Sequence, residues 1–136
     1  MNYPPHQPVP GQFGTAPHTD FGTLTVLVQD DCGGLEIYTR SGEWVQAPVV
    51  DGAFVVNIGD FMAYWTNDRF TSTPHRVINT SGQRRRSIPF FFNPSFDTVA
   101  ECLPSCCSAD NPARYPPMHY GEYLCKIYGR IFRDKN

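Results

Sequence analysis

Residues 23–47 read TLTVLVQDDCGGLEIYTRSGEWVQA, in which short apolar runs alternate with turn residues. Thr23–Gln29 is β-branched and apolar, which favours a strand, and the Asp-Asp-Cys-Gly-Gly segment that follows favours a turn. Leu35–Thr39 and Trp44–Ala47 flank Arg-Ser-Gly-Glu, with the glycine where a hairpin needs a positive φ. This stretch therefore predicts one buried strand followed by a β-hairpin.

The same alternation of strands and turns continues toward the C-terminus. Further strands are expected at Ala53–Ile58, Thr73–Asn79 and Arg84–Phe92, and Phe61–Trp65 is expected to be a strand or a short bridge. Seven or eight short strands favour a mainly all-β fold, either a sandwich or a jelly roll, because stacked or closed sheets hide their edges.

The two ends of the chain depart from this pattern. Residues 1–17 carry five prolines and predict an extended leading segment without a regular ladder. Residues 93–119 are rich in proline and cysteine and predict an irregular connection. Residues 120–132 place apolar side chains at helical intervals, which predicts one C-terminal helix. We therefore expect a single domain, with its core in residues 18–92.

Composition limits the classes of partner. The chain has 136 residues, 40% of them hydrophobic, which suits one domain with a real core. A formal net charge of -2 provides no general attraction to nucleic acid or to an anionic membrane. No apolar run is long enough to span a bilayer, and the first residues lack the order of a signal peptide. A cytoplasmic location and a small-molecule substrate are the resulting expectations.

The five cysteines are an odd number, so at least one must stay unpaired within the chain, which fits a reducing compartment. Cys102, Cys106 and Cys107 form a C-x3-C-C cluster, which lacks the paired C-x2-C spacing that zinc sites favour. Free thiols in a loop are therefore the preferred interpretation over a metal site.

The candidate metal ligands begin with His18 and Asp20. On an extended segment, residues two apart point to the same side, so an imidazole and a carboxylate converge. Such a pair is common by chance, and a histidine hydrogen-bonded in a proline-rich loop is the alternative. His75, in a later predicted strand, adds a third ligand, and two histidines with one carboxylate are typical of non-haem Fe(II) with open positions. His6 and His119, in proline-rich surroundings, are weaker candidates.

A candidate anion site lies on the strand RRRSIPFFF. Arg85 and Ser87 share a face, whereas Arg84 and Arg86 point the other way. A guanidinium beside a hydroxyl can bind a carboxylate through several charge-assisted hydrogen bonds. The alternative is a basic surface patch on an edge strand. Because an inward arginine among apolar residues would be costly without a partner, we expect it to need an anion.

These residues together resemble a known family. HTDFGTLTVLVQDDCGGLEI, the W-V-x-A-P of residues 44–48, FVVNIGD, STPHRV and RRSIPFFF resemble the isopenicillin N synthase-like branch of the 2-oxoglutarate/Fe(II)-dependent dioxygenases. The resemblance covers roughly residues 3–133. It implies a double-stranded β-helix, which is a jelly roll. It also implies that the family's long N-terminal region is missing in front of this chain, leaving an uncovered sheet edge prone to self-association.

The resemblance also implies roles for individual residues. The iron ligands would be His18, Asp20 and His75. The clamp for the distal carboxylate of 2-oxoglutarate would be Arg85 and Ser87, with Tyr3 in the same pocket. Asn57, on the inner face of a strand by alternation, is either a group that supports the ligands or the donor of a plain structural hydrogen bond. Three tyrosines of the C-terminal helix either form a pocket wall or belong to the core: Tyr120, Tyr123 and Tyr128.

The implied reaction uses Fe(II), dioxygen and 2-oxoglutarate, releases succinate and carbon dioxide, and oxidises a C–H bond of a small organic substrate. Hydroxylation is the default outcome, with desaturation or cyclisation as variants, in the setting of secondary metabolism. Two alternatives stay open: an Fe(II) oxidase of the same fold that does not use 2-oxoglutarate, and a truncated non-catalytic remnant.

Overall fold

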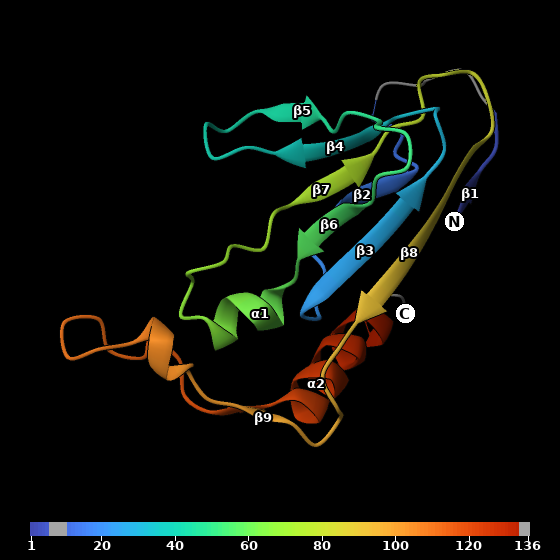
Figure 1. Ribbon diagram of the computed structural model, residues 1–136. Coiled ribbons are helices and arrows are strands. Elements are labelled where there is room, and N and C mark those ends of the chain that lie inside the picture. Colours follow the sequence, from blue (N-terminus) through green and yellow to red (C-terminus); the bar gives the residue numbers. More distant parts are fainter. Residues whose placement is uncertain (6–10, 134–136) are drawn as a thin grey trace.

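The computed structural model describes residues 1–5 and 11–133. Eight antiparallel strands form two layers (Figure 1). The first sheet contains, in spatial order, β1 (Asn2–Tyr3), β8 (Arg85–Phe92), β3 (Leu24–Gln29) and β6 (Val55–Ile58). The second contains, in spatial order, β2 (Thr15–His18), β7 (His75–Val77), β4 (Leu35–Tyr38) and β5 (Trp44–Gln46).

β3 lies inside the first sheet and organises it. It pairs with β8 from Leu24 opposite Phe92 to Gln29 opposite Ser87, and with β6 on its other side. Thr25 and Leu27 are buried, as expected for alternate residues that face the second sheet. The β-branched run predicted from the sequence is therefore a strand with one interior face and one outer face.

The chain crosses from one layer to the other between β7 and β8. The two strands follow each other in the sequence, with a turn at residues 80–83 between them, yet they belong to opposite sheets. The crossing brings His75 and Arg85 to facing layers. Four side chains form the core between the sheets: Tyr3 and Leu27 from the first, and Leu35 and Val77 from the second.

Residues 61–65 differ from the expectation. The predicted strand or bridge is wrong, because these residues belong to a helix, α1 (Asp60–Trp65). Its first amide groups have backbone partners: the N–H of Asp60 donates to the carbonyl of Asp20 at 2.7 Å, and that of Phe61 to Gly22 at 3.1 Å. Phe61 is fully buried, and Trp65, one turn later, packs on the same cluster. These long-range contacts decide in favour of the helix.

The leading segment also contains more regular structure than expected. Asn2–Tyr3 and Thr15–His18 form β1 and β2, which pair with β8 and β7 respectively. Both are edge strands, where a proline such as Pro17 can be accommodated because no ladder hydrogen bond is lost on the open side. The prediction of a segment without a ladder was therefore wrong at its two ends, while residues 6–10 lie outside the described part.

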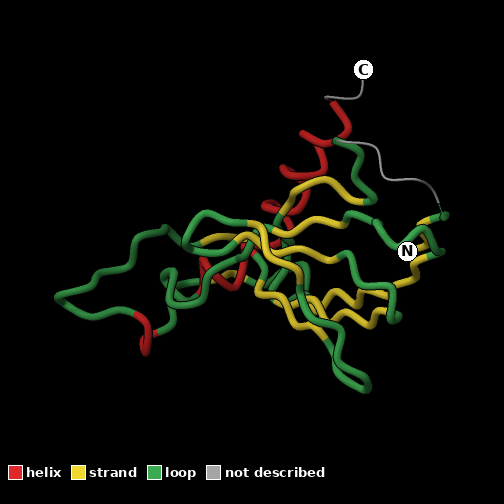
Figure 2. The backbone as a smooth tube through the Cα atoms, turned by 90° about the horizontal axis from the view of Figure 1, so that it is seen from above, coloured by secondary structure: helices red, strands yellow, loops and turns green. Residues whose placement is uncertain are grey.

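The C-terminal helix is confirmed as α2 (Tyr120–Arg133). Tyr120 joins Phe61 and Ala100 in a second buried cluster. Between β8 and α2, the predicted irregular connection contains the short pair β9 (Val99–Ala100) and β10 (Met118–His119), and a 3-10 turn, η1 (Pro104–Cys106). Figure 2 shows this connection projecting away from the two sheets.

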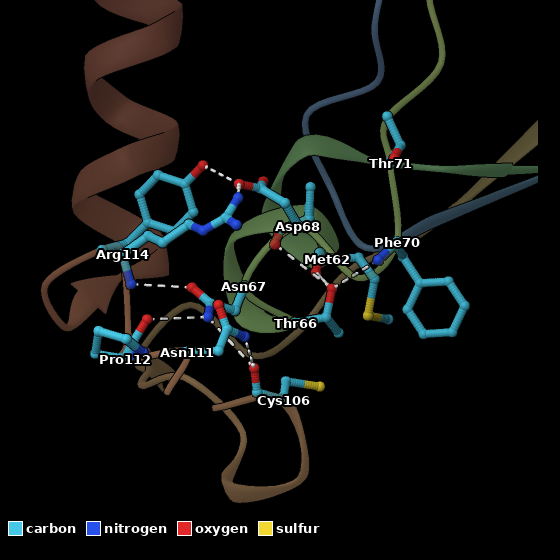
Figure 3. Close-up of polar contacts among 12 residues, drawn as sticks. Met62, Thr66, Asn67, Asp68, Phe70, Thr71, Cys106, Asn111, Pro112 and Arg114 are labelled. Atoms are coloured by element: carbon cyan, nitrogen blue, oxygen red, sulfur yellow. Dashed lines mark hydrogen bonds and ion pairs between the residues drawn. The ribbon is translucent and has the colours of Figure 1, made fainter. Parts of the chain in front are cut away.

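Asn67, just after α1, ties the projecting connection to the body (Figure 3). Its amide group donates to the carbonyls of Cys106 at 3.3 Å and Pro112 at 3.2 Å, and its Oδ1 accepts the N–H of Arg114 at 2.9 Å. Asn67 is buried and has a φ of +54°. Within residues 1–5 and 11–133, the helices are all too short or too polar to cross a membrane.

Candidate functional site

Two histidines and one aspartate meet at one end of the second sheet. His18 ends β2 and His75 begins β7, and the two residues lie opposite each other in the ladder. Asp20 follows two positions after His18. Its Oδ1 lies 3.9 Å from Nε2 of His18 and 3.7 Å from Nε2 of His75. The three side chains therefore offer their ligand atoms to one point, within 4.8 Å of one another.

Hydrogen bonds orient both imidazoles for a metal. Nδ1 of His18 lies 2.8 Å from the carbonyl of Ala16, and Nδ1 of His75 lies 3.1 Å from that of Thr73. With the proton on Nδ1, donating to these carbonyls, each Nε2 carries a free lone pair directed at Asp20. Oδ2 of Asp20 is buried and has no hydrogen-bond partner among the described residues. A cation at this point would satisfy the carboxylate, so the residues fit a metal ion.

The start of α1 supports the loop that carries Asp20. Besides the two backbone hydrogen bonds described above, Oγ1 of Thr19 donates to a carboxylate oxygen of Asp60 at 3.0 Å. Gly59 packs so closely that a Cβ there would clash with the carbonyl oxygen of Gly22. The helix and the loop that carries the candidate ligand Asp20 thus pack as a single unit.

Arg85 and Ser87 face the interior from the first sheet. Arg85 is 0% exposed and Ser87 is buried, whereas Arg84 and Arg86 are exposed, which confirms the alternation expected along this strand. The Phe90–Phe92 side chains are each more than half exposed, so these phenylalanines do not bury the arginine. Its burial comes instead from β1, β3 and the turn at residues 30–34, which supply the contacts to its guanidinium.

The guanidinium of Arg85 has neutral partners. Nε donates to the carbonyl of Gly33 at 2.5 Å, and the two terminal nitrogens donate to Oγ of Ser87 at 3.1 Å and to Oε1 of Gln29 at 3.0 Å. The ring of Tyr3 stacks on it at 5.1 Å. No ion pair joins Arg85 to an acid within the described residues. Of its five N–H groups, two remain for an anion.

A narrow cavity of about 80 Å³ joins the metal-ligating group to the arginine, because His18, Asp20 and His75 line it together with Arg85 and Ser87. Its wall also includes polar side chains from three other strands: Tyr3, Thr25 and Asn57. Oγ1 of Thr25 is buried without a partner among the described residues. The cavity thus combines apolar walls, including Leu27 and Leu35, with several groups that can hydrogen-bond a ligand.

Thr25 and Gln29 are polar residues near the site that reasoning from the sequence missed. Both lie on β3 at alternate positions with Leu27, so strict alternation places them on the interior face. The alternation of residues along this strand could therefore have identified both of them. What the sequence could not reveal is that Arg85, 56 positions later, lies within hydrogen-bonding reach of Gln29.

The weaker candidates lie elsewhere. His119 packs on Phe96 with ring centroids 6.4 Å apart and belongs to no metal-ligating group among the described residues, and His6 lies outside them. All five cysteines are free thiols. Partial burial, and next the neighbouring thiol of Cys107, raise the pKa of Cys102.

Several larger cavities among the described residues lie beside α2, and two of them bear on the site. One of about 540 Å³ lies between α1 and α2 and includes none of the three metal-ligating side chains. Another of about 250 Å³ includes His18 and Asp20. Because chemistry at a metal needs contact with its ligand group, the second cavity is the relevant one despite its smaller volume.

Comparisons with known proteins agree with this geometry. The family model for the 2OG-Fe(II) oxygenase superfamily matches residues 1–94. The chain is 50% identical over 120 residues to the 2-oxoglutarate-Fe(II) type oxidoreductase hxnY of Emericella nidulans, covering 88% of this chain and 34% of that protein. It is 41% identical over 136 residues to a 1-aminocyclopropane-1-carboxylate oxidase of Dictyostelium discoideum, covering 90% of this chain and 37% of that protein.

Solved structures give the same result. A full-length Neurospora crassa protein in complex with alpha-KG and thymine matches with a TM-score of 0.86 at 34% identity, over 90% of this chain and 38% of that one. A putative 2OG-Fe(II) oxygenase family protein from Caulobacter crescentus matches with a TM-score of 0.80 at 35% identity, over 96% and 44%. The expected double-stranded β-helix is thereby confirmed. The chain spans about a third of the length of the curated relatives named above.

Proposed function

Because the chain belongs to the 2OG-Fe(II) oxygenase superfamily, we propose that it forms the metal- and 2-oxoglutarate-binding part of an oxidoreductase acting on a small organic substrate. The observation that carries the proposal is the convergence of His18, Asp20 and His75 beside Arg85, a buried arginine without an acidic partner among the described residues. A carboxylate co-substrate bound next to a metal ion would satisfy both groups at once.

The metal role is assigned to His18, Asp20 and His75. Two imidazoles and one carboxylate occupy one face of an octahedral ion and leave three positions for other ligands. Fe(II) bound there would supply the oxidation chemistry with dioxygen. The chain itself contributes orientation: the carbonyls of Ala16 and Thr73 hold the rings, and the start of α1 holds the Asp20 loop.

The co-substrate role is assigned to Arg85, Ser87 and Tyr3. The two free N–H groups of the guanidinium would donate to one carboxylate of 2-oxoglutarate, and the hydroxyl of Ser87 would add a hydrogen bond. Tyr3, 7% exposed, lines the cavity, and its hydroxyl lies 2.9 Å from Oγ1 of Thr15. Its ring packs on the guanidinium and would keep water from the ion pair between Arg85 and the co-substrate. Asn57 and Thr25 would satisfy further oxygen atoms of the co-substrate.

Two alternative functions make different predictions. An Fe(II) oxidase that does not use 2-oxoglutarate is suggested by the similarity to a 1-aminocyclopropane-1-carboxylate oxidase. A non-catalytic remnant that keeps the candidate ligands without turnover is the second alternative. The guanidinium of Arg85, which has no acidic partner among the described residues, favours the 2-oxoglutarate-dependent reaction over both.

One experiment separates the three functions. The chain is titrated anaerobically with Fe(II), then supplied with 2-oxoglutarate and air, and succinate is measured. We expect one iron per chain and succinate formation that depends on iron. Iron binding without succinate would point to the oxidase, and failure to bind iron would point to the remnant.

Finer features are also proposed. The whole chain would act as one domain, in a cytoplasmic enzyme of secondary metabolism, and its outcome would be hydroxylation, desaturation or cyclisation. Self-association is proposed for the outer face of the first sheet, where Val56, Ile88 and Phe90 are each more than half exposed and β6 has an open edge.

A further inference from the structure

The cavity of about 250 Å³ beside the metal group has one wall made by α2. Tyr120, Leu124 and Tyr128 line it, and their spacing of four residues places them on one face of the helix. His18 and Asp20 line it as well, so a molecule in this cavity contacts the candidate metal centre directly. Its volume lies just below the usual range of ligand pockets, which is about 300–1,000 Å³.

One polar group on this wall is buried without a partner. Tyr120 is 3% exposed, and its hydroxyl has no hydrogen-bond partner among the described residues. Burial, and next the nearby Tyr128, raise the pKa of Tyr120, so the hydroxyl stays protonated and available as a donor. A buried hydroxyl without a partner is unusual in native proteins and calls for an explanation.

A second polar side chain, that of Asn93, also lines the cavity. Asn93 follows β8 in the chain. Its amide rests on Gly22, where a Cβ would clash with Oδ1 of Asn93. Gly22 therefore leaves the room that the amide occupies. An amide can both donate and accept, which suits a carbonyl or an N–H group of a ligand.

The charge of the wall is the third observation. Among the described residues that line the cavity there is no lysine or arginine. Apart from the tyrosines, the ionisable side chains of the lining are those of His18 and Asp20, which belong to the candidate metal group. Phe91 and Tyr128, 55% and 46% exposed, present aromatic surface. An anionic substrate would find no cationic side chain here, whereas a flat uncharged ring would find aromatic contacts.

We propose that the substrate held in this cavity is a small, uncharged, ring-containing molecule, hydrogen-bonded by Asn93 and Tyr120. The inference rests on the proposed function, because a molecule in this cavity would be oxidised only if the adjacent residues hold the metal ion. Tyr120 and Asn93 determine specificity, and Leu124 sets the depth of the cavity.

Benzamide and benzoate test the charge preference, because they share a ring and differ in charge. Their binding to the full chain, loaded with Zn(II) and saturated with 2-oxoglutarate, is measured by ligand-observed NMR. Saturation with 2-oxoglutarate keeps benzoate away from Arg85. We expect benzamide to bind at least about tenfold more tightly, a difference of about 1.4 kcal/mol. Equal binding, or tighter binding of benzoate, would overturn the proposal.

Variants locate the binding. Leu124→Trp fills the cavity and should abolish benzamide binding, and Asn93→Leu and Tyr120→Phe should each weaken it by roughly 3- to 10-fold, the loss of one net hydrogen bond. Tyr123→Phe is the matched control, because Tyr123 lies on the same helix but does not line this cavity. Asn93 is exposed, so its variant tests the proposal even if Leu124→Trp does not fold. Benzamide binding that is unchanged in Asn93→Leu and Tyr120→Phe would refute the assignment.

The two proposals fail differently. If wild-type protein binds neither Zn(II) nor 2-oxoglutarate, the proposed function fails, while benzamide binding that responds to Asn93→Leu in metal-free protein would still support the cavity. If Zn(II) and 2-oxoglutarate bind but benzamide does not, the substrate-class proposal alone is refuted.

Discussion

At the scale of single residues, the site contains two buried ionisable side chains, Arg85 and Asp20. Within the described part of the chain, neither has a full set of partners. Arg85 is fully buried with neutral hydrogen-bond partners, and Asp20 is 7% exposed with one oxygen atom lacking a partner. Burying a charge without a full set of partners is costly, so each residue is suited to a ligand of opposite sign. The two residues can be tested separately.

Replacing Arg85 with glutamine should remove most of the affinity for 2-oxoglutarate. Truncating one partner of a buried, hydrogen-bonded charge pair costs roughly 2–5 kcal/mol, which raises the Kd at least about 30-fold. Isothermal titration with 2-oxoglutarate in the presence of Zn(II) measures this. Arg86→Gln, exposed on the same strand, is the control and should bind normally. Unchanged affinity in Arg85→Gln would remove Arg85 from the co-substrate site.

Replacing Asp20 with alanine should abolish stabilisation by metal. A ligand present at about 100 times its Kd stabilises the folded state by about 2.7 kcal/mol, which appears as a rise in Tm. Thermal unfolding of wild type with and without Zn(II) should show this rise, and Asp20→Ala should not. Asp97→Ala, exposed and distant in sequence from the ligands, should behave like wild type. A metal-dependent rise that persists in Asp20→Ala would place the ion elsewhere.

At the scale of elements, α1 connects two parts of the fold. Its start supports the Asp20 loop through Gly59 and Asp60, and the residues after its end hold the projecting connection through Asn67. A helix of six residues has little stability of its own, so these tertiary contacts maintain it. Disturbing either end should have a distinct consequence.

Gly59→Ala should weaken metal binding. The added Cβ would clash with the carbonyl oxygen of Gly22 and lie 3.1 Å from that of Asp20, so the ligand loop must move. Disturbing groups that orient metal ligands typically costs about 10- to 100-fold in affinity. Zn(II) titration with a competing chelator measures the effect. Gly52→Ala, with a φ of +68° and open space around it, isolates backbone strain and should leave the metal affinity intact. Equal affinities in both variants would contradict the coupling.

Asn67→Ala should destabilise the fold by about 2–4 kcal/mol, because three hydrogen bonds of about 1 kcal/mol each are lost and alanine tolerates the positive φ poorly. Asn67→Gly loses the same hydrogen bonds without the backbone strain and should be roughly 1 kcal/mol more stable than Asn67→Ala. Urea unfolding measures both. If glycine proves no better than alanine, the left-handed backbone at this position contributes nothing.

At the scale of the whole molecule, the first sheet has one face in the core and an outer face that is unusually apolar. Ile88, Phe90 and Phe92 of β8 are 69%, 63% and 58% exposed, and Val56 of β6 lies across the sheet from this row. Contiguous exposed apolar surface of this kind favours association. In the second sheet, Tyr38 and Val45 are less exposed, at 40% and 38%.

Phe90→Lys should therefore reduce self-association without affecting the site. The added charge lies at the centre of the apolar row and opposes contact between copies. Sedimentation velocity over a range of concentrations should show oligomers of the wild type that are reduced in the variant. Val45→Lys, on β5 of the other sheet, is the matched control and should associate like wild type. A monomeric wild type at all concentrations would disprove the proposed association.

The sequence by itself determined the features that depend on neighbouring residues. Alternation along Arg84–Ser87 indicated which arginine faces inward, the β-branched run predicted β3, and helical spacing predicted α2. The candidate ligands His18 and Asp20 were recognisable because two residues of one extended segment share a side. In each case the relevant distance is spanned by a few consecutive residues, so local geometry suffices.

Only the tertiary structure decided the rest. Residues 60–65 form a helix because the carbonyls of Asp20 and Gly22 satisfy its first amides, and β1 and β2 exist because β8 and β7 offer open edges. The same holds for Gln29 beside Arg85 and for Tyr120 beside the metal group. These contacts join residues that are far apart in the sequence, and no local pattern specifies such pairs. They form only when the folded chain as a whole reaches its lowest free energy.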